Sequence, residues 1–466
     1  GSVVIELTLA EIAAAIKGKI VIGSAELIVS GNADTDSRAL APGGIFFAKL
    51  GEHDDGHRYL EQVVGTAALA VVSKPNTALE LPQIQVSDTV AALTALAQYV
   101  LNRVRSQGEL QVIGITGSNG KTSTKNMLRE ILGRVGPTVA PRDSFNNEVG
   151  LPLTVLRLEE NTKFLVLEMG AAGIGSIAAL ASWCLPDVGV ELKVGLAHAG
   201  AFGGIEVTAQ IKRELMQFVR RAVVLNEDDP VVRAFEPNTG VKRIGFGFAR
   251  EADFEIKSVD LSLSGTKLAI RYPDGEVSEL TLKMLGEHQA MNVSAALAVA
   301  QELGIDRKIA IAAVSEMEMA ERWRMQLIKR SDGVYFINDA YNASPDSMRA
   351  ALQTLATLGR QGHRTIAVLG QMAELGQYST EEHDQLGRLV VRYNIDQLYV
   401  VGQEAKLIHM GATQEGSWDG ESVFCETISA AFEAICDKLS PGDVVLVKSS
   451  NVAGLRFLGD ELAGVK

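Results

Sequence analysis

The residues with the clearest chemistry lie in a glycine-rich stretch, GITGSNGKTSTK, at positions 114–125. An apolar, strand-like segment at 110–116 leads into it, and a helical pattern follows it. Glycine lets the backbone turn tightly and approach phosphate oxygens closely. Successive N–H groups and the N-terminus of a helix bind anions. The stretch therefore predicts a loop that holds the phosphates of a nucleotide.

Lys121 and Thr122 follow the last glycine of this loop. In phosphate loops a lysine here reaches the β- and γ-phosphates, and the hydroxyl coordinates Mg²⁺. Gly114 lies six residues before Gly120, against five in the standard pattern, so the loop is a variant of it, GxxGxxGK[ST]. An ordinary strand–helix turn is the alternative, which the flanking strand, the helix and the GKT sequence disfavour. The residues predicted to contact the nucleotide are Gly114, Thr116, Gly117, Ser118, Asn119, Gly120, Lys121, Thr122 and Ser123.

Three further side chains could serve this site. Glu168 ends the apolar segment 163–170, and a carboxylate at the end of a parallel strand beside a phosphate loop is placed to bind Mg²⁺. Without the loop, Glu168 would be interpreted as a solvated strand-end residue. His198 lies in the glycine-containing stretch GLAHAGAFGG, and its spacing leaves a metal ligand and a structural role equally open. Lys212 lies in a helical pattern, where composition alone favours a solvated lysine.

Apolar strands and helices alternate around these residues. Segments 110–116, 163–170 and 221–229 are predicted strands, and 205–219 is a predicted helix. This alternation predicts a mostly parallel, helix-covered sheet of the α/β class. Segment 254–285 alternates with period two and contains turn residues, which predicts antiparallel hairpins added to that sheet.

The chain length predicts about three domains, and the two ends of the chain differ from its centre in their pattern of strands and helices. Residues 1–106 mix short strands with an amphipathic helix at 89–104. Beyond about residue 325, four apolar strands alternate with helices, which predicts a Rossmann-like α/β domain. We expect domains at 1–106, 107–322 and 323–466, the central one built on a P-loop-type, mostly parallel sheet.

The composition restricts the setting. The formal net charge of −13 disfavours nonspecific binding to nucleic acids, because phosphate repulsion opposes approach. The cysteine count is odd, at three, and no CxxC pair occurs. This predicts a reducing compartment, the cytoplasm. No apolar run reaches the roughly 20 residues that span a bilayer.

Four stretches, in this order, resemble the Mur ligase family: GITGSNGKTSTK, SFNNEVGLPLTVL, FLVLEMGA and INDAYNASPDSMRAAL. The N-terminal DSRALAPGGIFFAKLGEHDDGH is similar to the UDP-sugar-binding domain of one branch of that family. That branch adds D-alanyl-D-alanine to UDP-N-acetylmuramoyl-tripeptide, the last cytoplasmic peptide addition in peptidoglycan precursor synthesis. The resemblance implies this reaction, driven by ATP with Mg²⁺ through an acyl-phosphate, in a monomer with no nucleic-acid partner.

The resemblance also implies roles for individual residues. Thr122 and Glu168 match ligands of a first Mg²⁺, His198 matches a second-metal histidine, and Lys212 matches a lysine that family members carbamylate. Lys121, His198 and Lys212 are accordingly the implied catalytic residues. The implied contacts to the rest of the nucleotide are His288, Asn292, Arg322 and Asp339. The implied substrate residues are Ser37, Arg38, Asn146, Asn147, Thr154, Tyr341, Asn342, Ser344 and Pro345.

Several positions depart from the family pattern. Lys193 stands where the family has an Asn before the metal histidine, and Gly200 replaces an acidic residue after it. Ser176, Gln289, Gln371 and Ser449 are further departures. Two alternatives therefore stay open at this point: another amino-acid ligase of the Mur or folylpolyglutamate type, and a binding protein that hydrolyses ATP without ligation.

Overall fold

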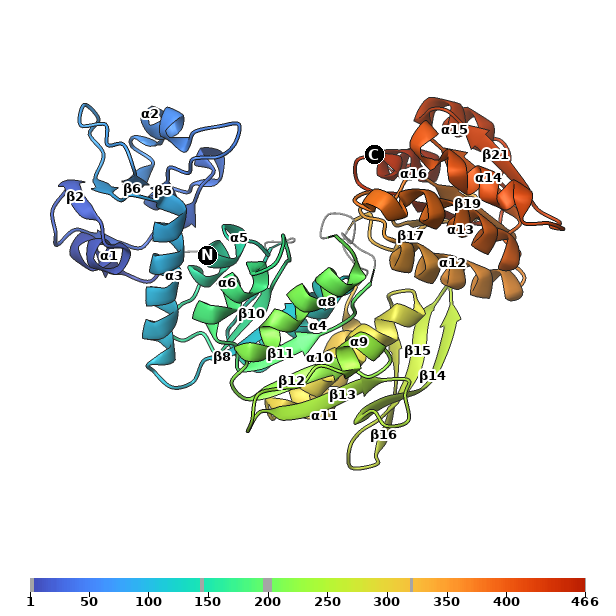
Figure 1. Ribbon diagram of the computed structural model, residues 1–466, viewed down its shortest axis with the longest axis horizontal. Helices are drawn as coiled ribbons and strands as arrows, with labels where there is room; N and C mark the ends of the chain where they lie inside the picture. The colour runs from blue at the N-terminus through green and yellow to red at the C-terminus, as the bar shows by residue number, and fades with distance from the viewer. Residues whose placement is uncertain (1–3, 143–145, 196–202, 319–321, 466) are drawn as a thin grey trace.

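The computed structural model describes residues 4–142, 146–195, 203–318 and 322–465. The molecule has three lobes, each built around its own large sheet (Figure 1). The N-terminal lobe and the C-terminal lobe lie apart at the top of the view, and the central lobe joins them below. Each of the three large sheets draws its strands from one of the three predicted domains, whose exact boundaries stay predictions.

The N-terminal lobe contains a five-stranded sheet in the order β2-β7-β6-β5-β4. Its strands are β2 (Lys19–Ile22), β7 (Gln83–Gln85), β6 (Ala67–Val72), β5 (Gly44–Phe47) and β4 (Ala33–Asp34). Helices α1 (Leu9–Ile16) and α2 (Leu60–Val63) pack nearby, and β1 (Leu7–Thr8) pairs with β3 (Ile28–Val29).

Helix α3 (Thr89–Arg105) connects this lobe to the central one. Asp88 caps its first turn by accepting from the N–H groups of Val90 and Ala91. Its apolar face shares one core with both lobes, because Leu93 and Leu96 belong to the same buried cluster as Leu165 of the central sheet. Burial of this continuous apolar surface fixes the N-terminal lobe to the centre.

The central sheet has nine strands in the order β16-β15-β14-β13-β12-β11-β8-β10-β9. Strands β8 (Gln111–Thr116), β9 (Thr138–Val139), β10 (Phe164–Glu168), β11 (Val188–Glu191), β12 (Ala222–Asn226) and β13 (Lys242–Gly247) are parallel. The predicted hairpins are confirmed as β14 (Phe254–Ser262), β15 (Gly265–Arg271) and β16 (Val277–Leu282), which pair antiparallel.

Helices cover both faces of this sheet. One face packs on α4 (Lys121–Gly133), α10 (Glu287–Glu302) and α11 (Arg307–Glu316). The other packs on α3, α5 (Gly150–Val155), α6 (Ser176–Cys184), α8 (Ile205–Arg213) and α9 (Pro230–Arg233). The predicted helix 205–219 is shorter than expected, because α8 gives way to a 3-10 turn at Glu214–Gln217.

The C-terminal sheet has six strands in the order β17-β18-β22-β19-β20-β21. They are β17 (Gln326–Lys329), β18 (Tyr335–Asn338), β22 (Val444–Lys448), β19 (Thr365–Leu369), β20 (Gln397–Val401) and β21 (Glu421–Cys425). All pairings are parallel except that of β17 with β18. One face packs on α12 (Pro345–Arg360), α13 (Ser379–Arg392) and α14 (Lys406–Gln414), and the other on α15 (Ile428–Ile435) and α16 (Leu455–Ala463).

The predicted fold class, a three-lobed α/β protein with a Rossmann-like C-terminal part, is confirmed. All three cysteines are free, with Cys184 and Cys425 buried and Cys436 exposed. Every helix in the described ranges is too short or too polar to traverse a lipid bilayer.

Candidate active site

The glycine-rich loop joins β8 to α4 and uses backbone conformations that glycine favours. Gly117 and Gly120 have φ values of +148° and +89°. A Cβ at Gly120 would lie 2.5 Å from Oδ1 of Asn292. Asn292 lies on α10, so the loop approaches this helix too closely for any side chain at position 120. The sequence prediction placed both residues at the nucleotide, and the structure brings them together.

Glu168 and Thr122 meet beside this loop. Thr122 Oγ1 donates to Glu168 Oε1 at 3.2 Å, and Glu168 is only 1% exposed. Glu168 Oε2 accepts no hydrogen bond within the described residues and lies 3.6 Å from Nζ of the fully buried Lys125. Burial raises the pKa of the Glu168 carboxyl, which Lys125 partly opposes. The idea of a solvated strand-end glutamate is therefore wrong, and a buried carboxylate oxygen remains to bind a cation.

This pair fits a magnesium ion. Mg²⁺ prefers oxygen ligands and usually takes one or two from the protein, with water and substrate phosphates completing its shell. A hydroxyl and a carboxylate with one unsatisfied buried oxygen match that demand. Within the described ranges, no three His, Cys, Asp or Glu side chains gather into a fuller metal site. His198, the predicted second-metal ligand, lies outside the described residues.

Two lysines converge on the carbonyl of Gly117. Lys121 Nζ donates to it at 2.9 Å, and Lys212 Nζ donates to it at 3.2 Å. Lys212 is 3% exposed, so the solvated lysine that composition favoured is wrong. Burial lowers the pKa of both ammonium groups, that of Lys212 strongly and with the added repulsion of Lys121. Two buried lysines at one carbonyl disfavour each other's charged forms, and an anionic ligand bound at the loop would stabilise them.

Glu191 is a charged residue of this site that sequence reasoning missed. It ends β11, is 1% exposed, and its Oε2 has no hydrogen-bond partner in the described chain. Burial raises its pKa well above the usual value, and the charge of Lys212 opposes that rise. Glu191 and Glu168 end strands on either side of β8, at the level of Thr116 and Ile115. The available signal was a single carboxylate in the otherwise apolar run VGVEL.

His288 lies where α10 meets the C-terminal lobe. Burial lowers the pKa of His288 to about 4, while the charge of Asp339 raises it and that of Lys448 lowers it. Asp339 and Lys448 belong to the C-terminal lobe. Nδ1 of His288 is buried without a hydrogen-bond partner among the described residues. The predicted nucleotide residues His288 and Asp339 thus come within electrostatic reach across the two lobes.

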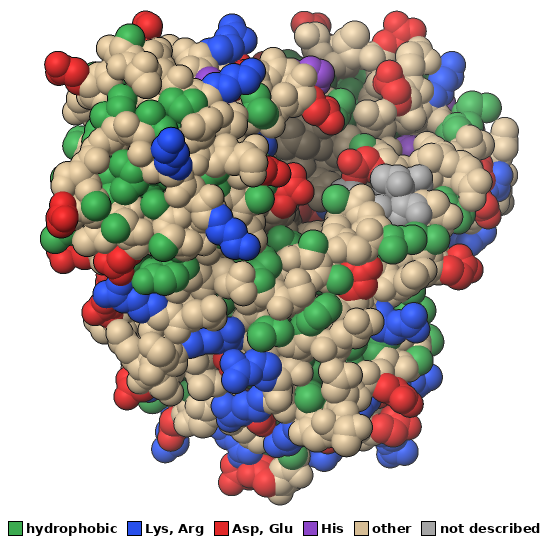
Figure 2. All heavy atoms as spheres, turned by 60° about the vertical axis from the view of Figure 1, so that its left-hand side comes forward, with side chains coloured by type: hydrophobic (Ala, Val, Ile, Leu, Met, Phe, Trp, Pro, Cys, Tyr) green, Lys and Arg blue, Asp and Glu red, His purple; other side chains and the backbone are tan. Residues whose placement is uncertain are grey.

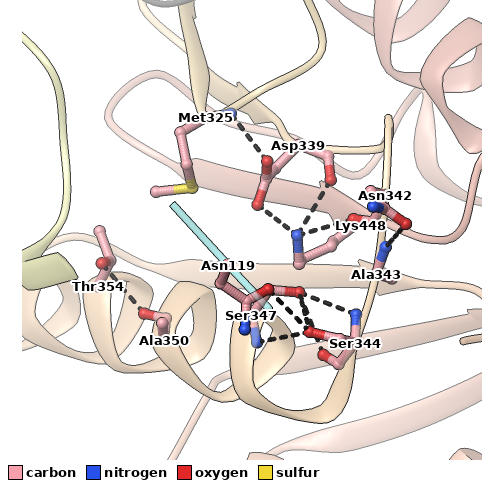
Figure 3. Close-up of polar contacts among 10 residues, drawn as sticks. All are labelled: Asn119, Met325, Asp339, Asn342, Ala343, Ser344, Ser347, Ala350, Thr354 and Lys448. Carbon is pink, nitrogen blue, oxygen red and sulfur yellow. Dashed lines mark hydrogen bonds and ion pairs between the residues drawn. The ribbon is translucent and has the colours of Figure 1, made fainter. Parts of the chain in front are cut away.

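Asp339 is held tightly at the end of β18. Lys448 Nζ lies 2.6 Å from Asp339 Oδ2 and also donates to the carbonyl of Asn342 at 3.0 Å (Figure 3). The N–H of Met325 donates to Asp339 Oδ1 at 2.9 Å. Lys448 therefore fixes both ends of the segment 339–342, which holds the predicted dipeptide residues Tyr341 and Asn342.

Arg324 lies within electrostatic reach of the charged groups beside the phosphate loop, whereas Arg322 pairs with Asp460. Arg322 is half exposed and donates to Asp460 Oδ2 at 2.8 Å. The charge of Arg324 acts on both Lys121 and Glu168, and its guanidinium lies 4.3 Å from the ring centre of Tyr341. Trp323, between them, has a φ of +66°. Because of this bend, Arg322 and Arg324 contact different partners, which their spacing of two residues in the sequence did not predict.

The predicted dipeptide residues surround the start of α12. Ser344 is the N-cap and Pro345 the first residue of the helix, and Ser344 and Ser347 form a capping box. Ser344 Oγ also donates to Oδ1 of Asn119 in the phosphate loop, at 3.3 Å. The start of this helix therefore faces the nucleotide site directly.

The predicted central-lobe substrate residues divide into two kinds. Asn146 packs against Gly170, which follows Glu168 by two residues. A Cβ at Gly170 would lie 2.7 Å from the Asn146 side chain. Asn147 Oδ1 accepts from the N–H groups of Val149 and Gly150 at the start of α5. Thr154 is 1% exposed and its hydroxyl donates to Gly150 within the same helix. Asn146 borders the site, whereas Asn147 and Thr154 shape α5 in this structure.

The predicted UDP-sugar residues Ser37 and Arg38 lie in a short 3-10 turn of the N-terminal lobe. Arg38 is largely exposed and pairs with Asp36 at 3.1 Å. The space-filling view shows a hollow between the two upper lobes of the molecule, with Asp and Glu side chains at its rim (Figure 2). Substrate parts held by different lobes would have to meet across this hollow.

Comparisons with known proteins agree with this geometry. Residues 115–300 match the Mur ligase middle domain, and residues 323–451 match the domain described as "Mur ligase, glutamate ligase domain". The UDP-N-acetylmuramoyl-tripeptide–D-alanyl-D-alanine ligase of Mycobacterium tuberculosis is 40% identical over 499 aligned positions, which cover 98% of each chain.

Solved structures give the same result. MurF from Acinetobacter baumannii superposes with a TM-score of 0.89 at 28% identity, over 99% of both chains. MurF from Thermotoga maritima in complex with ADP has a TM-score of 0.80 at 26% identity, over 93% of this chain and 98% of that one. Since the two matched regions span more than half of the sequence and a 40% identical relative aligns along almost all of it, the chain belongs to the Mur ligase family.

Proposed function

We propose that this chain is an ATP- and Mg²⁺-dependent ligase that joins D-alanyl-D-alanine to UDP-N-acetylmuramoyl-tripeptide. The observation that carries this assignment is the 40% identity to a ligase of that name over 98% of both chains. The phosphate loop, with its lysine and its buried carboxylate, supplies the chemistry that such a reaction needs. The product would be the UDP-linked pentapeptide, with ADP and phosphate.

The first chemical difficulty is charge repulsion. The tripeptide carboxylate must attack the γ-phosphorus of ATP, and both groups are anionic. Lys121 would neutralise the γ-phosphate from within the loop, in a site whose low dielectric strengthens that attraction. Thr122 and Glu168 would hold Mg²⁺, which lowers the repulsion further when bound. This step forms an acyl-phosphate and releases ADP.

The second step needs a free amine. The amine of D-alanyl-D-alanine attacks the acyl carbon, loses a proton, and displaces phosphate. The start of α12 supports a role here, because Ser344 contacts Asn119 of the phosphate loop. A groove beside this point is lined by Pro345, Arg349, Met372, Glu382, Gln385, Leu386, Leu389 and Arg392. Its cations, carboxylate and apolar groups suit a small zwitterion with two methyl groups.

Lys212 and His198 would serve the second metal, as the family resemblance implies. Carbamylation converts a lysine into an anionic oxygen ligand and requires a neutral amine. The burial of Lys212 and its proximity to Lys121 both favour that neutral form. Glu191 is a second buried carboxyl group within electrostatic reach of Lys212, and its oxygen without a partner among the described residues offers a further ligand for a cation.

The remaining nucleotide would lie between α10 and the C-terminal lobe. His288, Asn292 and Asp339 border this region, and Arg324 fits a phosphate contact better than Arg322 does. Asn146 would contact the peptide beside Glu168, and Ser37 and Arg38 would contact the UDP-sugar in the N-terminal lobe. We also assign the reaction to the cytoplasm and expect a monomer, which light scattering of a chromatographed sample can test.

The test is the substrate requirement of phosphate release. Purified protein with ATP and Mg²⁺ is assayed with each substrate alone and with both. We expect sustained release only when UDP-N-acetylmuramoyl-tripeptide and D-alanyl-D-alanine are both present. Equal release without either substrate would instead identify an ATP-hydrolysing binding protein. Turnover with a single amino acid in place of the dipeptide would identify a different ligase.

A further inference from the structure

The central lobe and the C-terminal lobe meet at a small polar junction beside the phosphate loop. On the central side it consists of Ser118, Asn119, Lys193 and Gly195, and on the other side of Ser344 and Asp346 at the start of α12. Lys193 Nζ lies 3.6 Å from Asp346 Oδ1. Lys193 and Asp346 are 153 positions apart in the chain, so only the seating of one lobe on the other brings them together.

The segment Lys193–Gly195 is tied to the phosphate loop on both sides of Ser118. The N–H of Ser118 donates to the carbonyl of Lys193 at 2.6 Å, and the N–H of Gly195 donates to Ser118 Oγ at 3.0 Å. The N–H of Val194 donates to Asp229 Oδ2 at 2.8 Å, which fixes the segment to the start of α9. The backbone at Lys193 is therefore hydrogen-bonded directly to the phosphate loop.

The start of α12 fits closely onto this segment. A Cβ at Gly195 would lie 1.9 Å from Oδ2 of Asp346, so the Asp346 carboxylate rests against a glycine. Two residues earlier, Ser344 Oγ donates to Asn119 Oδ1 at 3.3 Å, as Figure 3 shows. At this junction the two lobes are joined through two adjacent polar links, of which the Lys193–Asp346 pair is ionic.

We propose that Lys193 is a positioning residue for the ligation reaction: its ion pair with Asp346 seats the start of α12 on the phosphate loop. Through that seat it aligns Tyr341, Asn342, Ser344 and Pro345 with the acyl-phosphate that forms above the loop. This inference rests on the proposed function for its kinetic part, and on the lobe junction alone for its structural part.

The size of the effect follows from the exposure of the pair. The Lys193 side chain is 48% exposed, whereas that of Asp346 is 15% exposed. Pairs with an exposed partner stabilise by modest amounts, which correspond to about two- to fivefold in an equilibrium. We therefore expect Lys193→Met to raise the KM for D-alanyl-D-alanine by about two- to fivefold, with little change in ATP affinity. Lys193→Arg, which keeps the charge, is expected to restore the wild-type KM.

Asp346 also lies 3.4 Å from Arg349 on its own helix, so a single substitution there changes more than the contact between the lobes. A double-mutant cycle with Lys193→Met and Asp346→Asn isolates the pair across the lobes. The two changes are expected to be less than additive in KM. Since salt screens exposed pairs, raising NaCl should increase the KM of the wild type and leave that of Lys193→Met nearly constant.

The matched control is Lys283→Met. Lys283 is 47% exposed and pairs with Glu318 at 2.8 Å, so it matches Lys193 in exposure and also pairs with a carboxylate, although Glu318 is 84% exposed. Both of its residues belong to the central lobe, and its loss should leave the KM for the dipeptide unchanged.

The structural arm uses hydrogen–deuterium exchange of the intact protein without substrates. Backbone amides of segment 341–349 are expected to exchange faster in Lys193→Met than in the wild type or Lys283→Met. This readout needs no ligase activity, so it separates the two proposals. Wild-type exchange in Lys193→Met would overturn the positioning role, even if its KM rises, because Lys193 would then be contacting substrate directly. Additive effects in the cycle would overturn it as well.

Discussion

Buried charges of both signs alternate around the phosphate loop. Lys121 and Lys212 share the carbonyl of Gly117, while Glu168 and Glu191 approach from strands on either side of β8. Isolated buried charges are costly, and each of these is compensated by a neighbour or by a ligand. On both glutamates one oxygen has no hydrogen-bond partner among the described residues, and these oxygens mark where cations are expected to bind.

Lys121→Ala should abolish acyl-phosphate formation, because nothing then offsets the repulsion between carboxylate and γ-phosphate. We expect kcat to fall by at least about a hundredfold, the scale seen when a preorganised charge is removed. Phosphate release under saturating substrates measures this. Lys308→Ala, at an exposed position of α11, is the control and should retain wild-type turnover. Near-normal turnover of Lys121→Ala would refute the role given to the loop.

Lys212→Ala should also lose activity, and a short carboxylic acid should partly restore it if a carbamate normally supplies the oxygen ligand. The same change removes the buried stem of Lys212 and leaves a cavity, so a lower unfolding midpoint is expected as well. Activity with and without added acetate, together with a thermal melt, checks both parts. Full activity of the variant, with no response to acetate, would contradict the assignment of Lys212.

His288 should make stability depend on pH in mildly acidic solution. Its pKa is lowered from 6.5 to about 4 in the folded chain, so the unfolded chain takes up its proton first as pH falls. Stability is then lost between about pH 6.5 and 4, with a slope of at most about 1.4 kcal/mol per pH unit. His288→Asn should show a shallower loss in urea unfolding over this window. His53→Asn, at an exposed site, should behave like the wild type, and an identical slope in both variants would count against this account.

At the scale of elements, the loop between β8 and α4 depends on glycine at a defined position. Gly120→Ala would force a side chain into a φ of +89° and against Asn292. Such strain costs about 1–3 kcal/mol, so the Kd for ATP should rise about five- to 150-fold by calorimetry. Gly133→Ala, at the end of the same helix, meets no atom within 4 Å and should bind ATP normally. Equal affinities for the two variants would contradict the close loop–helix contact.

The sequence predicted elements well where local patterns decide them. Apolar runs gave β8, β10, β12 and the C-terminal strands, and period-two alternation gave the hairpins at 254–285. The end of α8 was missed, because the helical periodicity of 205–219 continues through a 3-10 turn. The bend at Trp323 was also missed, and with it the position of Arg324, whose charge reaches the phosphate loop. Its positive φ depends on packing against other elements, which local propensity does not contain.

Long-range contacts lay beyond sequence reasoning for the same reason. Glu191 of β11 and Lys212 of α8 come within electrostatic reach only in the folded central lobe, and Lys193 meets Asp346 only between lobes. Motif order nevertheless predicted that the loop, Glu168, Asn292 and Asp339 belong to one region. The structure agrees for these residues, whereas Thr154 is enclosed within α5.

At the scale of the whole molecule, three lobes must bring a UDP-linked carboxylate, a nucleotide and an amine to one point. We expect a nonhydrolysable ATP analogue with UDP-N-acetylmuramoyl-tripeptide to favour the arrangement in which α12 rests on the phosphate loop. Small-angle scattering should then show a smaller radius of gyration than for the free protein. Superimposable curves with and without these ligands would argue against substrate-driven closure.

The most direct test of the central claim is the stoichiometry between ATP consumption and the new amide bond. ADP and the UDP-linked product are measured by liquid chromatography and mass spectrometry in one reaction that contains both substrates. The account predicts one UDP-N-acetylmuramoyl-pentapeptide for each ADP formed, and no product with Lys121→Ala. Formation of ADP without any pentapeptide would contradict it.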